Sequence, residues 1–98
     1  MTTHVNIVRL MIDSLIPREM SVIELSKALC QAGGVSDVAL SVTDVSAKTE
    51  TIRLVISGHN IDYDAISKIM SEHAAAIRGI DEVDVSRGKG PASPIKSD

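Results

Sequence analysis

Val8–Ile12 (VRLMI) recurs in this 98-residue chain as Ile52–Ile56 (IRLVI), and Gly34–Ser41 (GVSDVALS) recurs as Gly79–Ser86 (GIDEVDVS). The second copy follows the first by 44 residues in one case (52 − 8) and by 45 in the other (79 − 34), so the chain consists of two related halves. All four stretches are rich in β-branched and aliphatic residues, with apolar residues at every second position, which is typical of strands. Each half therefore begins and ends with a strand.

A helix is expected between the two strands of each half. Ser21 and Glu24 have the spacing of a capping box, and Gly33-Gly34 follows as a helix-ending signal. Asp62 is the expected N-cap of the second helix. The predicted strands are His4–Asp13, Val35–Ser46, Thr49–Ser57 and Ile80–Ser86, and Pro17 predicts a loop over Ser14–Met20.

Two strand–helix–strand units joined by a tight hairpin define the split βαβ arrangement. Right-handed crossovers then place both helices on one face of the sheet. The sequence therefore predicts an α+β, ferredoxin-like βαββαβ fold with a four-stranded antiparallel sheet of order 4-1-3-2. Residues 1–87 form this single domain, and the Gly-, Pro- and Ser-rich residues 88–98 are expected to be a disordered tail.

Composition excludes several classes of function. Aromatic residues make up 1% of the chain, with Tyr63 alone, and the net charge is −3. Nucleic-acid binding draws on aromatic stacking and clustered basic residues, so no nucleic-acid partner is expected. Residues Met1–His4 lack the basic and apolar character of a signal peptide, and the sequence has no apolar run of about 20 residues, so no signal peptide and no membrane association are expected. A single cysteine, Cys30, excludes an internal disulfide and indicates a cytoplasmic protein.

Strand alternation assigns side chains to two faces of the sheet. The uniformly apolar set, which includes Leu10, Leu54, Val83 and Val85, is expected to face the helices. The opposite face is open, and it is either a solvated surface or a contact surface. The residues predicted to form an interface on this open face are Ile7, Arg9, Met11, Arg53, Val55 and Asp84.

No combination of residues indicates catalysis. His4, His59 and His73 are not at metal-ligand spacing, and Cys30 has no neighbouring base in the sequence. The two glycine-containing stretches, Gly33-Gly34 and Gly88-Lys89-Gly90, lack the strand-to-helix context of a phosphate loop. We therefore expect no catalytic or cofactor-binding residues and no enzymatic activity.

The acidic residues leave two interpretations open. Asp62 and Asp64 lie at a helix start, where capping and the helix dipole account for them. Asp13 and the run Asp81–Asp84 have the oxygen ligands that a hard cation such as Ca²⁺ prefers. Acids at strand ends are commonly just solvated, and the chain has no EF-hand loop.

Several short motifs resemble one known family: Leu10–Asp13 followed by Pro17, Thr49–Ile52, Gly58 with Ile61–Asp64, and Ile80–Val83. It is a small archaeal family known only as domain of unknown function two hundred and eleven, and the resemblance runs from the first strand to the fourth. It implies a ferredoxin-like fold, ring-shaped homo-oligomers and no established activity. It also implies calcium in a relative, which favours Asp13, Asp81 and Glu82 as metal-binding positions.

Two functional hypotheses follow. The leading one is a non-enzymatic homo-oligomeric assembly or binding module that uses strand edges and the open sheet face. The alternative is a sensing domain for a calcium-type divalent cation or an unknown small ligand, similar to regulatory ferredoxin-like domains. The two hypotheses differ in whether a bound ligand or self-association stabilises the chain.

Overall fold

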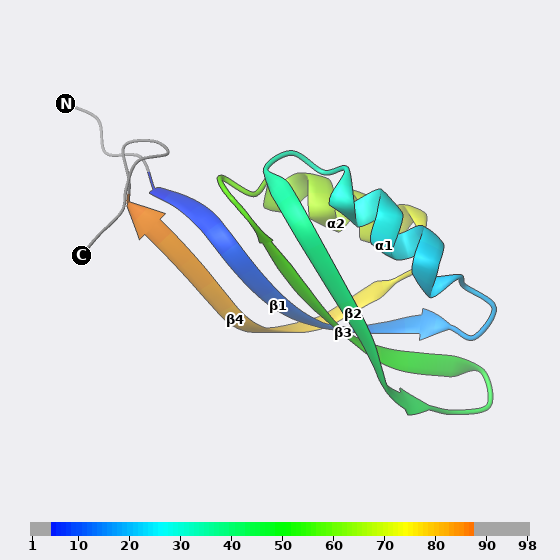
Figure 1. Ribbon diagram of the computed structural model, residues 1–98. Helices are drawn as coiled ribbons and strands as arrows, with labels where there is room; N and C mark the ends of the chain where they lie inside the picture. Colours follow the sequence, from blue (N-terminus) through cyan, green and yellow to red (C-terminus); the bar gives the residue numbers. More distant parts are fainter. Residues whose placement is uncertain (1–4, 88–98) are drawn as a thin grey trace.

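The computed structural model describes residues 5–87 (Figure 1). The predicted tail, residues 88–98, lies outside this range. The elements are β1 (Val5–Pro17), α1 (Val22–Cys30), β2 (Val35–Val45), β3 (Thr49–Gly58), α2 (Tyr63–Glu72) and β4 (Ala76–Arg87).

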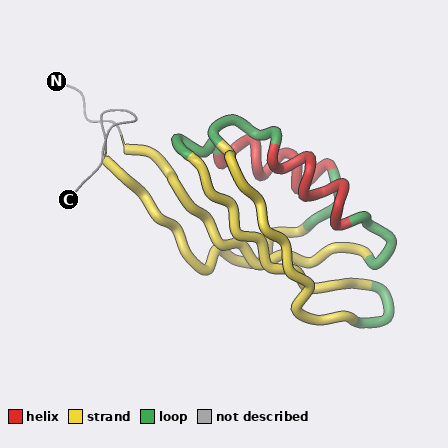
Figure 2. The backbone as a smooth tube through the Cα atoms, in the orientation of Figure 1, coloured by secondary structure: helices red, strands yellow, loops and turns green. Residues whose placement is uncertain are grey.

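The four strands form one antiparallel sheet in the order β2-β3-β1-β4, with β1 and β3 in the middle. Both helices lie on the same side of this sheet, and the other side has no covering layer in the described part of the chain (Figures 1 and 2). The predicted βαββαβ fold and strand order are therefore confirmed. Strands β2 and β4 are the two edges.

Both helices begin where the capping signals place them. The backbone N–H of Glu24 donates to Ser21 Oγ (3.2 Å), and that of Ala65 donates to Asp62 Oδ1 (3.1 Å). These bonds satisfy amide groups that have no partner within the helix. Side-chain oxygens in the sequence thus determine both helix starts.

The core lies between the helices and the two middle strands. Leu25 and Leu29 of α1, with Ile66 and Met70 of α2, are fully buried on the helix side of the sheet. The sheet contributes aliphatic residues that are at most 1% exposed: Leu10, Ile12, Ile16, Ile52, Leu54 and Ile56. Burial of such side chains contributes roughly 1.5–3 kcal/mol each, so this layer supplies most of the stability.

Strands β1 and β4 are longer than predicted. β1 continues through the expected loop to Pro17, and β4 begins at Ala76, four residues before the predicted start. Ser14 pairs with Ile77, and its buried hydroxyl donates to the Ala76 carbonyl (2.8 Å). Pro17, which predicted the loop, is the last residue of β1 and pairs with Thr49, so its missing N–H does not interrupt the strand before it.

A β-bulge near the start of β1 changes the face of Ile7. Opposite β4, Ile7 pairs with Val85 and Arg9 pairs with Asp84, so Val8 is an extra residue. Ile7 packs against the core as a result. The prediction that Ile7 belongs to the open face is therefore wrong, because strict alternation does not hold across a bulge.

Candidate interaction surfaces

The two helices are much shorter than the strands beneath them. α1 has 9 residues and α2 has 10, so each is about 15 Å long. β1 has 13 residues and β4 has 12, which corresponds to about 40 Å. In Figure 1, β1 and β4 extend past the helices at one end, and the β2–β3 hairpin extends past them at the other. The helices therefore cover only the centre of their side of the sheet.

Three large apolar residues of β4 remain exposed on the helix side. Ile80, Val83 and Val85 are 42%, 46% and 53% exposed. Each pairs with a residue of β1 that lies in or against the core, so their side is certain. We call these three residues the β4 edge strip. The prediction that Val83 and Val85 face the helix side is therefore confirmed, although both are about half exposed there.

The opposite edge strand has a similar feature. Val42 pairs with the buried Ile52, and Val45 pairs with Glu50, which in turn lies opposite the buried Ile16. Val42 and Val45 therefore point to the helix side, where they are 45% and 50% exposed. We call them the β2 edge strip. Both free edges of the sheet thus present aliphatic side chains to solvent.

The open face has a small apolar centre between two arginines. Met11 lies directly between Val55 of β3 and Glu82 of β4, and Ala39 of β2 lies on the other side of Val55. Arg9, two positions before Met11 in β1, lies between Ser57 and Asp84. Five of the six predicted interface residues therefore share this face: Arg9, Met11, Arg53, Val55 and Asp84.

Ion pairs occupy two of the three residues predicted to bind a metal. Glu82 Oε2 contacts Arg9 Nη1 at 2.6 Å, and Asp81 Oδ2 lies 3.6 Å from Arg53 Nη2. Asp13 pairs in register with Arg53 and with Gly79. Among residues 5–87, no three His, Cys, Asp or Glu side chains come together as a possible metal-binding group. The calcium site at these positions stays a prediction.

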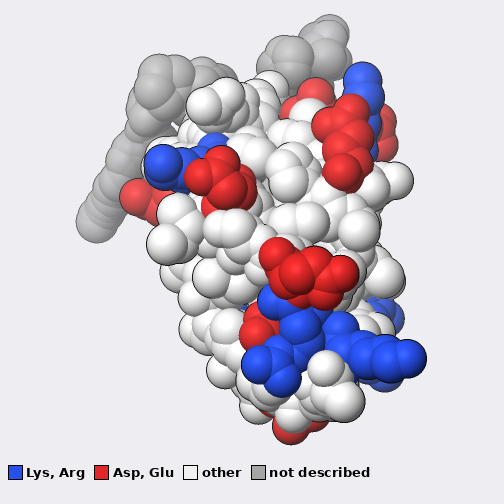
Figure 3. All heavy atoms as spheres, turned by 90° about the vertical axis from the view of Figure 1, so that its right-hand side faces the viewer, with Lys and Arg blue, Asp and Glu red and all other residues white. Residues whose placement is uncertain are grey.

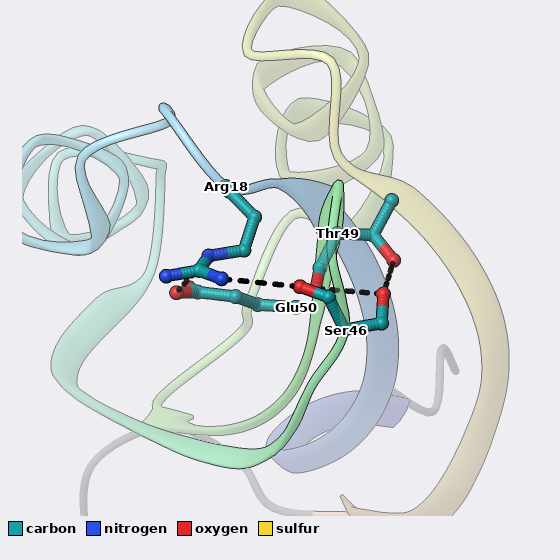
Figure 4. A network of polar contacts seen from close by, with 4 residues as sticks. All are labelled: Arg18, Ser46, Thr49 and Glu50. Carbon is teal, nitrogen blue, oxygen red and sulfur yellow. Dashed lines mark hydrogen bonds and ion pairs between the residues drawn. The ribbon is translucent and has the colours of Figure 1, made fainter.

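A polar network holds the tip of the β2–β3 hairpin against the loop after β1 (Figure 4). The Arg18 guanidinium donates to the Ser46 carbonyl (3.2 Å), and its Nε lies 3.8 Å from Glu50 Oε2. The Ser46 and Thr49 hydroxyls are 2.8 Å apart across the turn. Figure 3 shows that basic and acidic groups adjoin each other at this end of the molecule. These contacts fix the position of the β2–β3 turn, at the opposite end of β2 from the residues that pack against the core, Val35, Val38 and Leu40.

The residues weighed for catalysis do not converge. The ring of His73 lies 2.8 Å from the Ile69 carbonyl of its own helix, which accounts for one ring nitrogen. Cys30 is exposed at the end of α1, and its Sγ lies 3.8 Å from the Ser36 carbonyl. Within the described chain, neither helix has the length and apolar run needed to cross a membrane.

Sequence reasoning missed the two edge strips, although a signal was present. The predicted strands are longer than helices of about ten residues can cover. A strand residue adds about twice as much length as a helix residue. Long strands beneath short helices therefore have apolar positions that no helix covers. Which positions remain uncovered depends on bulges, which the alternation pattern does not reveal.

These features define a ferredoxin-like α+β domain in which, over residues 5–87, the outer edges of β2 and β4 are unpaired and one face of the sheet is open. Within that class, the chain belongs to the DUF211 family, described as "Uncharacterized ArCR", whose model matches residues 8–89. It is also similar to "Uncharacterized protein MJ0319" of Methanocaldococcus jannaschii, with 30% identity over 75 residues. That alignment covers 76% of this chain and 77% of the relative.

Proposed function

We propose that the protein is a non-enzymatic module that assembles with copies of itself through its sheet edges, forming a closed, ring-like homo-oligomer in the cytoplasm. The observation on which this proposal depends is the pair of apolar edge strips. Exposed aliphatic residues on a free strand edge are a liability for a monomer, because the edge also has unpaired N–H and C=O groups. Pairing with another copy satisfies the backbone groups and buries the side chains.

The open face supports a second contact in the same module. Met11 and Val55 form its centre, and the Arg9–Glu82 and Arg53–Asp81 ion pairs lie on either side of them. An apolar centre with a charged rim is a common form of protein contact surface. This face suits a partner that binds the assembled protein, since edge pairing leaves it free.

Light scattering coupled to size exclusion tests the assembly. The full chain at micromolar concentration is expected to have a mass that is a multiple of its 10.4 kDa. Val83→Lys places a charge in the β4 edge strip and is expected to reduce the mass to that of a single chain. A monomeric wild-type protein would contradict the proposal.

Ile23→Lys is the matched control for this experiment. Ile23 is 64% exposed on α1 and belongs to neither edge strip. Introduction of the same charge at this aliphatic residue, which is more exposed than Val83, is expected to leave the mass unchanged. Loss of assembly in both variants would show that general apolar exposure, and not the sheet edge, drives association.

A further inference from the structure

The geometry of the two edges points to a specific joint: we infer that β4 of one copy pairs antiparallel with β2 of the next, with Val83 opposite Val42 and Ile80 opposite Val45. This inference rests on the proposed self-assembly and specifies which surfaces meet. Three features of the described residues support it: the strand directions, the spacing within the two strips, and the charges on the open side.

Strand direction permits the joint. β2 is antiparallel to β3, β3 is antiparallel to β1, and β1 is antiparallel to β4. β2 and β4 therefore run in opposite directions within one copy. If the next copy is placed with its helices on the same side, its β2 is antiparallel to the first copy's β4. The sheet then continues across the joint without reversing its faces.

The apolar residues of the two edge strips have the same spacing along their strands, because each strand contains a bulge. In a regular strand, residues on one side are separated by two or four positions. Ile80 and Val83 are three positions apart because Asp81 is an extra residue opposite β1. Val42 and Val45 are also three positions apart, because Thr43 is an extra residue opposite β3. One antiparallel register therefore brings both apolar pairs together, and Val85 lies opposite Leu40 in that same register.

Charge opposes the pairing of β4 with its own copy. A symmetric β4–β4 joint that matches the apolar residues would place Asp81 and Glu82 opposite Glu82 and Asp81 of the second copy. Four carboxylates would then meet on the open side, and like charges opposite each other destabilise a sheet. In the β4–β2 joint, Glu82 lies opposite Thr43 and Asp84 lies opposite Ser41. One acidic pair remains, Asp81 with Asp44, and Arg53 lies beside that Asp81.

A β2–β2 joint is the remaining alternative, and it covers only one of the two edge strips. It would bury the β2 edge strip and leave Ile80, Val83 and Val85 in water. The β4–β2 joint buries both strips with one repeated contact. Such a contact is heterologous, so each added copy presents a new free edge until the assembly closes on itself.

Disulfide trapping tests the joint in the full chain, in a Cys30→Ser background that removes the native thiol. Directly opposed residues of an antiparallel pair have Cα atoms about 4.5–5.5 Å apart, which a disulfide spans. Under mild oxidation, Val42→Cys with Val83→Cys is expected to give a ladder of covalent species beyond the dimer on a non-reducing denaturing gel. Each single cysteine variant alone is expected to give none, and a mixture of the two is expected to give covalent dimers.

Two further double variants distinguish the alternatives. Ile80→Cys with Val83→Cys cross-links only if β4 pairs with itself, and Val42→Cys with Val45→Cys cross-links only if β2 does. Efficient cross-linking of either would overturn the β4–β2 joint. If none of the three double cysteine variants cross-links while light scattering shows an oligomer, the joint is wrong but the proposed self-assembly is not contradicted. If light scattering shows a monomer, both the β4–β2 joint and the proposed self-assembly are wrong.

Discussion

The middle strands and the edge strands have the same apolar alternation on the helix side of the sheet, but they differ in burial. Leu10 of β1 is 1% exposed, whereas its direct cross-strand neighbour Val83 of β4 is 46% exposed. Ile52 and Val42 differ in the same way across β3 and β2. An apolar residue on the correct face is therefore not necessarily a core residue. Burial depends on whether a helix lies above it.

This difference separates two uses of aliphatic residues in one sheet. Under α1 and α2, the middle strands supply the energy of folding. Past the helices, the edge strands present apolar side chains that a single copy does not cover. Variants at paired positions can separate these roles, because substitutions in the covered layer change folding and substitutions at the edges change assembly.

The largest difference is expected between Leu10→Ala and Val83→Ala, which truncate opposite members of one cross-strand pair. Leu10→Ala leaves a cavity in the packed core and is expected to lower the free energy of unfolding by about 2–5 kcal/mol. Val83→Ala is expected to cost about 1 kcal/mol or less in the monomer, because its side chain is already half in water. Urea unfolding followed by circular dichroism measures both, at a chain concentration at which light scattering shows the monomer. Similar losses for the two variants would contradict the comparison.

A smaller effect is expected at Ser14, the fully buried hydroxyl of β1. Ser14→Ala removes the hydrogen bond to the Ala76 carbonyl, which is partly buried, and is expected to cost about 1–2 kcal/mol, because that carbonyl loses its donor. Ser41→Ala on the exposed side of β2 is the control and is expected to change stability by less than about 0.5 kcal/mol. Chemical denaturation of both variants gives the difference. Equal costs at the two serines would show that the bond to β4 does not stabilise the domain.

A gain in stability is expected at Ala74, which has a left-handed backbone (φ 59°) after the end of α2. The Ala75 N–H donates to the Met70 carbonyl and the Ala74 N–H donates to that of Ser71, so the turn is a Schellman motif with alanine where glycine is preferred. Ala74→Gly is expected to raise the free energy of unfolding by about 0.5–1 kcal/mol. Because the change is distant from both edge strips, the mass by light scattering is expected to stay the same. A thermal melt that shows no gain would contradict the interpretation of the turn.

The exposed ion pair between Arg9 and Glu82 is expected to contribute less. A double-mutant cycle with Arg9→Ala and Glu82→Gln is expected to give a coupling energy of about 0.2–1 kcal/mol, because both side chains remain partly solvated. The coupling is expected to fall as salt is added. A coupling several times larger would mean that the open face is shielded from water, as it would be beneath a partner.

The assembly hypothesis expects no stabilisation from calcium, whereas the cation-sensing hypothesis does. Two of the predicted ligands, Asp81 and Glu82, are each engaged by an arginine, and a cation that binds only the folded state would have to displace both contacts. Melting temperatures with millimolar CaCl₂ and with a chelator are expected to coincide. A rise with calcium that is absent in Asp81→Asn combined with Glu82→Gln would instead support the cation-sensing hypothesis.

The amino-acid sequence was sufficient for the fold, because its signals are local. Alternation identified the strands, Ser21 and Asp62 marked the helix starts, and the repeat gave the topology and strand order. The same reasoning placed Arg9, Met11, Arg53 and Val55 on the open face correctly. It failed at Ile7, because a bulge depends on how β1 fits against β4 and not on the composition of β1 alone.

The exposure of the edge strips, the pairing of Asp81 and Glu82 with arginines, and the matched bulges were decided only in three dimensions. Each depends on residues far apart in the chain: which strand a helix covers, which guanidinium reaches across β1, and where two strands differ by one residue. Local patterns determine which way a side chain points. Tertiary packing determines what, if anything, covers it.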